Sequence, residues 1–200
     1  MSSVTGDWPD DFAATLDFHG HLCLDIAMGY RVTKAALRAL GPEAADPKRL
    51  VASVGGDTCA VDAVQALSCC TFGKRNLVPL HTGKPVYIWQ NAATGNGVRI
   101  YVHYWETFDA DGTFRSTQRH FKDGELSPDE AAAFEAEHEQ LIRLILNGPE
   151  ADLFRLSRIS QPPPPRSGGF AASPCGVCGE YVKEGLLMDG RCTECAGPAG

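Results

Sequence analysis

Two short segments in the first third of the chain concentrate side chains that can bind a metal or activate a sulfur. The first segment runs from Phe18 to Cys23 and the second from Asp57 to Asp62. Together they offer two imidazoles and two thiols: His19, His21, Cys23 and Cys59. Imidazole nitrogen and thiolate sulfur are donors that zinc and other transition ions favour. We therefore expect a core metal site built from both segments.

The backbone between residues 19 and 23 decides which of the donors converge. An extended segment places His19, His21 and Cys23 on one side, whereas a helix places His19 and Cys23 together and turns His21 away. Gly20 permits either path. The alternative without a metal is the start of a helix, in which the histidines bond to the backbone and the cysteine is buried. The ligand set of His19 and His21 therefore stays open at this point.

Cys59 has a second source of reactivity. Asp57 or Thr58 can cap a helix, which places Cys59 in its first turn. Free backbone amides and the helix dipole at such a position favour thiolate over thiol. The predicted roles are nucleophile or metal ligand for Cys59 and orienting carboxylate for Asp62. The alternative is a cysteine that is simply a small buried apolar group.

Two Cys-x-x-Cys pairs stand near the C-terminus. Their thiols can close a tetrahedral zinc shell made by Cys175, Cys178, Cys192 and Cys195. Four thiolates leave no open coordination position, so we expect this zinc to be structural. The alternatives are a pair of disulfides or a disordered tail.

The chain divides at a stretch rich in proline and glycine. We expect a core domain over residues 1–160, a linker over 161–173 and a zinc module over 174–200. The last segment is too short to bury a core of its own, which is why it needs the metal.

Helical and extended patterns are mixed within the core domain. We expect a helix that ends at Gly41-Pro42, a strand over 49–56, a helix from residue 57 and another from Ser127 to Leu146. Residues 85–92 and 98–107 alternate as strands, and the glycine-rich turn between them predicts an antiparallel hairpin.

Composition narrows the range of partners. The 200 residues are 44% apolar and carry a formal charge of −7. This balance disfavours nucleic acid, although a zinc module could bind it locally with strongly salt-dependent affinity. We expect no membrane span, no secretory signal, a cytoplasmic location and reduced thiols.

Three motifs in this order resemble those of one known family. They are residues 18–23, residues 57–65 and residues 70–77. The resemblance is to the FmdE family, which comprises the E component of formylmethanofuran dehydrogenase and its bacterial relatives. It implies an α+β fold with an antiparallel sheet packed with helices, commonly dimeric, in which the first two motifs line a metal-binding or active-site cleft. The four-cysteine tail resembles the treble-clef zinc finger that many members append.

The resemblance also implies a function. The expected protein is an accessory factor or small enzyme linked to molybdenum or tungsten oxidoreductases of formyl or formate metabolism. Its expected cofactors are a structural zinc in the tail and a second transition metal in the core, and its expected partners are a second copy of the chain, an oxidoreductase complex and an unidentified small-molecule substrate. The alternative is a non-catalytic adaptor that docks through its zinc module.

This sequence departs from the family pattern at two places. Leu24-Asp25 follows the motif cysteine where members usually have Pro-Gly, and Arg75 stands where they usually have glycine. Asp25 thereby adds a carboxylate beside the expected core site.

Overall fold

The computed structural model describes residues 8–164, 171–183 and 185–197. The chain forms two compact units, residues 1–164 and residues 165–200. Residues 165–170 of the expected linker lie outside the described part. The helices of the first unit are α1 (Asp10–His19), α2 (Leu24–Leu40), the 3-10 turn η1 (Gly41–Ala44), α3 (Ala60–Ser68), α4 (Tyr104–Phe108), α5 (Thr113–Asp123), α6 (Pro128–Asn147) and α7 (Glu150–Leu153). Its strands are β1 (Leu50–Val54), β2 (Leu77–Pro79), β3 (Val86–Asn91), β4 (Asn96–Val102) and β5 (Phe154–Ser160).

The five strands form one sheet in the order β2-β1-β3-β4-β5. The pairs β1–β3, β3–β4 and β4–β5 are antiparallel, and β1–β2 is parallel. The predicted α+β class is confirmed, and the sheet is mixed at one edge. The reason is that α3 lies between β1 and β2 in the chain, and a strand-helix-strand crossover returns the second strand in the same direction as the first.

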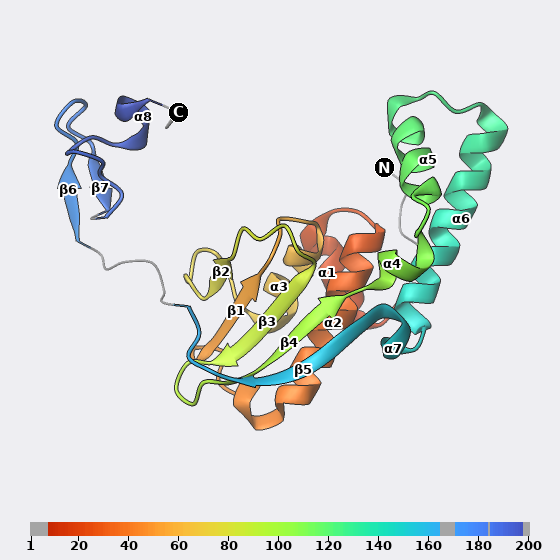
Figure 1. Ribbon diagram of the computed structural model, residues 1–200, viewed down its shortest axis with the longest axis horizontal. Helices are drawn as coiled ribbons and strands as arrows, with labels where there is room; N and C mark the ends of the chain where they lie inside the picture. Colours follow the sequence, from red (N-terminus) through yellow and green to blue (C-terminus); the bar gives the residue numbers. More distant parts are fainter. Residues whose placement is uncertain (1–7, 165–170, 184, 198–200) are drawn as a thin grey trace. The chain divides into compact units, whose positions relative to one another are not determined.

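Helices α1, α2 and α3 cover one face of this sheet (Figure 1). Alternate residues of β1, Leu50, Ala52 and Val54, belong to the core together with Trp89 of β3. The two segments that carry the motif residues are therefore held on the helical side of the sheet. Arg75, at the position where the family usually has glycine, has φ 57° and so adopts the left-handed conformation that glycine favours.

A close helix contact fixes the distance between α2 and α3. A Cβ added to Gly29 of α2 would lie 2.5 Å from the carbonyl oxygen of Ala60 at the start of α3. Glycine in a helix interior costs about 1 kcal/mol relative to alanine. Its use here lets the backbone of α3 approach α2 at the residue that follows Cys59.

Helix α1 is tied to α2 through the Asp11 carboxylate. It accepts hydrogen bonds from the Tyr30 hydroxyl, at 2.9 Å, and from the Lys34 ammonium. These bonds hold the pKa of Asp11 below its usual value, with the Lys34 hydrogen bond as the largest cause.

Helices α5 and α6 lie side by side and extend beyond the end of β4 (Figure 1). Aromatic contacts between Phe114, Phe121 and Phe134 join them. The predicted start of α6 is present as a complete capping box of Ser127 and Glu130. At its other end, the Arg31 guanidinium of α2 donates hydrogen bonds to the carbonyl oxygens of Ile145, Leu146 and Gly148 at 2.6, 2.5 and 2.9 Å.

The second unit contains β6 (Ala172–Pro174), β7 (Tyr181–Lys183) and the short helix α8 (Thr193–Ala196). Strands β6 and β7 pair antiparallel. Across the described residues of both units, no helix has the length and apolar content to cross a membrane.

Candidate metal centre

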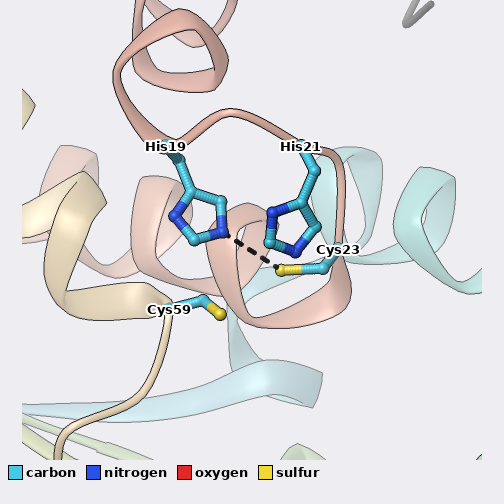
Figure 2. Close-up of side chains that lie close together, drawn as sticks. All are labelled: His19, His21, Cys23 and Cys59. Carbon is cyan, nitrogen blue, oxygen red and sulfur yellow. Dashed lines mark hydrogen bonds between the residues drawn. The ribbon is translucent and has the colours of Figure 1, made fainter. Parts of the chain in front are cut away.

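The structure brings the four donors of the N-terminal motifs together. One donor atom from each of His19, His21, Cys23 and Cys59 lies within 4.8 Å of every other. Figure 2 shows both imidazoles and the Cys23 thiol pointing into one small space, with the Cys59 thiol approaching from α3. His19 ends α1, His21 lies in the connection between α1 and α2, and Cys23 and Cys59 precede α2 and α3.

The connection between α1 and α2 follows neither of the two predicted paths. Helix α1 ends at His19, and Gly20 caps it with φ 94°. Cys23 then adopts an extended conformation as the N-cap of α2, where its sulfur accepts a hydrogen bond from the Ile26 amide at 3.4 Å. The chain reverses within four residues, so that both histidines and Cys23 meet although they share neither a strand nor a helix face. Gly20 is needed because that φ is unfavourable for residues with a Cβ.

Cys59 occupies the N-cap position of α3. The contact of Gly29 with Ala60 brings this helix start against α2, whose own N-terminus carries Cys23. Both thiols therefore stand at helix N-termini, and the predicted cap of α3 at Asp57 or Thr58 lies at Cys59 itself.

Asp62 anchors one of the two imidazoles. Its Oδ2 lies 2.8 Å from Nδ1 of His19, whose side chain is only 7% exposed. A carboxylate on Nδ1 holds the proton there and leaves Nε2 as the free donor, as in carboxylate–histidine–metal arrangements. The Nε2 of His19 points toward Cys23 and lies 3.9 Å from its sulfur.

Gln65, a residue to which the sequence motifs assigned no role, extends this chain of hydrogen bonds. Its Oε1 accepts from the Phe72 amide at 3.3 Å, and its Nε2 lies 3.3 Å from Oδ1 of Asp62. Because a backbone N–H can only donate, the orientation of the side-chain amide is settled, and Nε2 donates to Asp62. The signal in the sequence was the spacing of Asp62 and Gln65, which puts both on one face of a helix.

Without a bound cation, burial disfavours the charged form of the acidic groups in and beside the cluster. Burial raises the pKa of the Cys23 thiol to about 12. Burial also raises the pKa of Asp25, which the charge of Lys122 partly opposes. Two thiols and two imidazoles in this space form a donor set that fits zinc or a similar transition ion, because a metal replaces the thiol protons and relieves the cost of burying thiolates.

An open cavity of about 1220 Å³ borders the cluster. His21, Cys23 and Cys59 contribute to its lining, together with Asp25 and Tyr87. Helices α4, α5 and α6 also line the cavity, through Trp105, Arg115, Phe121, Lys122 and His138. The cavity is large enough for a small-molecule ligand.

The tail cysteines form a second cluster. Donor atoms of Cys175, Cys178, Cys192 and Cys195 also lie within 4.8 Å of one another. Backbone amides of Cys178, Cys192 and Val177 donate to the Cys175 sulfur and lower its pKa to about 6. Such amide bonds to sulfur stabilise thiolates, which are the protonation state that binds metal.

The fold and the two clusters define an α+β protein with a mixed Cys/His site in its core and a four-cysteine site in a small appended unit. The family model described as "FmdE, Molybdenum formylmethanofuran dehydrogenase operon" matches residues 18–155. The chain belongs to the FmdE family.

Two relatives place the chain within a broader set. A solved structure of a tungsten formylmethanofuran dehydrogenase FmdE-like protein from Syntrophus aciditrophicus is 21% identical, with a TM-score of 0.62, and the match covers 92% of this chain and 89% of that one. This likeness shows the fold. A protein of Archaeoglobus fulgidus described as a probable S-adenosyl-L-methionine-binding protein is 28% identical over 191 residues, which are 90% of this chain and 51% of the relative. The chain spans about half the length of that curated relative.

Proposed function

We propose that this chain is a metal-binding protein of the FmdE type that acts as an accessory factor or small enzyme alongside a molybdenum or tungsten oxidoreductase of formyl or formate metabolism. The observation that carries the proposal is the convergence of His19, His21, Cys23 and Cys59 beside an open cavity. In this proposal the core holds a transition ion, the tail holds a structural zinc, and a homodimer is the working form.

The roles of the core residues follow from their positions. Cys59 is a metal ligand or a nucleophile that faces the cavity, and Cys23 and the two histidines complete the ligand set. Asp62 positions His19 through its 2.8 Å contact. A bound transition ion would supply Lewis acidity and would hold sulfur ligands as thiolates. The cavity is the place for the substrate, and S-adenosyl-L-methionine is the first ligand to test, because the Archaeoglobus relative is described as binding it.

Metal counting on full-length protein tests the proposal. We expect two ions per chain, one lost in Cys59→Ser and the other lost in Cys192→Ser. Cys69→Ser is the matched control, since Cys69 is exposed and belongs to neither cluster. One ion per chain in both the wild type and Cys59→Ser would show that the core holds none, and two ions per chain in both would show that Cys59 is not a required ligand.

A specific observation favours the second candidate, an adaptor that docks through the zinc module. Four large apolar side chains in the second unit are more than half exposed: Val177, Tyr181, Leu186 and Met188. Exposed apolar groups on so small a unit are typical of a binding surface. Loss of the oxidoreductase partner on Tyr181→Ser, with the core metal retained, would support the adaptor.

A further inference from the structure

The two histidines of the core cluster are held very differently. His19 is almost fully buried, and its Nδ1 is fixed by Asp62, which Gln65 holds in turn. The His21 side chain is exposed, and within the described residues neither of its ring nitrogens has a hydrogen-bond partner. Its ring contacts the His19 ring, at 4.3 Å between centroids.

This difference affects how firmly each imidazole could hold a metal. A carboxylate on the second ring nitrogen fixes the orientation of a histidine and raises its basicity, and losing that partner typically weakens metal affinity about 10- to 100-fold. His19 has this support, and His21 lacks it. His21 also lies outside both helices, in the short connection between α1 and α2 that follows Gly20.

The weakly held ligand lies on the side from which a small molecule would arrive. His21 lines the 1220 Å³ cavity together with Cys23 and Cys59, whereas His19 does not. Two lysines, Lys84 and Lys122, line the same cavity, and the charge of Lys122 reaches both Asp25 and His138. No carboxylate lies within salt-bridge distance of either lysine among the described residues. They can therefore pair with a negative group on a ligand, although the carboxylates of Asp25, Glu106, Glu135 and Glu139 line the same cavity.

We propose that His21 is an exchangeable ligand of the core metal, and that a small thiolate entering from the cavity takes its place. A soft sulfur donor suits a site that already has two thiolates. In the exchange the bond from the metal to the His21 nitrogen would break and a bond to the incoming thiolate sulfur would form, with no change of oxidation state; the proton that the free thiol gives up to become thiolate would pass to solvent. The inference rests on the proposed core metal and explains how a cluster with four protein ligands can still accept a substrate.

Cobalt substitution of the full-length protein tests this proposal. The visible spectrum of Co²⁺ reports its ligands, and the spectrum of Cys59→Ser supplies the contribution of the tail site for subtraction. We expect mercaptoacetate to change the core spectrum saturably, and to bind more tightly than cysteamine, whose far end is positive. In His21→Ala the core should keep its Co²⁺ and bind mercaptoacetate at least about tenfold more tightly, because no imidazole has to be displaced.

His19→Ala is the matched variant, two residues away. It should weaken Co²⁺ binding at least about tenfold more than His21→Ala does, because it removes the supported ligand. Equal losses in the two variants, or a wild-type core spectrum that mercaptoacetate leaves unchanged, would identify a closed structural shell and overturn the proposal. A wild-type spectrum identical to that of Cys59→Ser would instead remove the core metal itself, and so would count against the proposed function.

Discussion

At the scale of single residues, the core cluster depends on Asp62 and Gln65, which are not among the four potential ligands but hold His19 in place. The four potential ligands were predictable, because imidazoles and thiols at such density are uncommon without a purpose. Asp62 was predictable as an orienting carboxylate, but which histidine it serves was not. The spacing of Gln65 from Asp62 shows that both lie on one helix face, but the contact of Gln65 with the Phe72 amide depends on the chain folding back onto α3.

Asp62→Asn tests whether the contact of Asp62 with His19 supports the core site. Oδ2 of Asp62 faces the His19 ring, and Oδ1 accepts from Gln65. Asparagine must present its NH₂ group to one of these donors and also loses the charge that supports the imidazole. We expect core metal affinity to fall about 10- to 100-fold, measured by competition with a chelator.

Asp152→Asn is the control, because Asp152 is an exposed carboxylate on α7 that lies outside both clusters. An unchanged core affinity in Asp62→Asn would mean that His19 is not held through this contact.

At the scale of elements, the site depends on where helices begin and end. The strand β1, the hairpin of β3 and β4, and α6 with its cap follow their local patterns and were predictable. The second hairpin strand ends at Val102, earlier than expected, because Tyr104 and its neighbours form α4 and pack as aromatic groups. The reversal between α1 and α2 depends on the left-handed Gly20, a choice that local patterns leave open.

Gly29→Ala tests the contact between α2 and α3. The added methyl group would meet the backbone of Ala60, which cannot yield without moving the start of α3 and Cys59 with it. We expect a loss of about 1–3 kcal/mol in the free energy of unfolding, measured by denaturant titration with a chelator present, and a reduced core metal content. Gly73→Ala is the control, since a Cβ added at Gly73 would meet nothing within 4 Å. A fully loaded, equally stable Gly29→Ala would contradict this role of the helix contact.

Asp11→Asn tests the link between α1 and α2 through its pH dependence. The folded pKa of Asp11 is lowered, so the charged form stabilises the fold above the unfolded pKa of about 4, and this contribution is lost as pH falls through the folded value. We expect the variant to be less stable than the wild type by under about 1 kcal/mol at pH 7, and the difference to shrink below about pH 4. Denaturant titrations at both pH values measure this stability difference, and exposed Asp10→Asn is the control. A stability difference that stays constant with pH would rule out the charge of Asp11 as its source.

At the scale of the whole molecule, the fold class and the residues of the two clusters of potential ligands could be predicted, and the cavity could not. Its walls come from the first helices, from β3 and from the pair α5 and α6, which are far apart in the chain. Neither α1, α5 nor β5 was predicted, because their apolar patterns are short or interrupted. Because α5 was not predicted, the position of Lys122 at the same cavity as Asp25 could not be predicted either.

The grip of Arg31 on the end of α6 has a consequence for how the cavity can change shape. Arg31 lies on α2, the helix whose N-cap is Cys23. The same helix therefore contacts both the end of α6 and the core cluster. The end of α6 next to the sheet cannot swing without breaking three bonds to carbonyl oxygens. The three bonds therefore fix the end of α6 to the same helix that carries the Cys23 cap, and leave the start of α6 and α5 without this anchor.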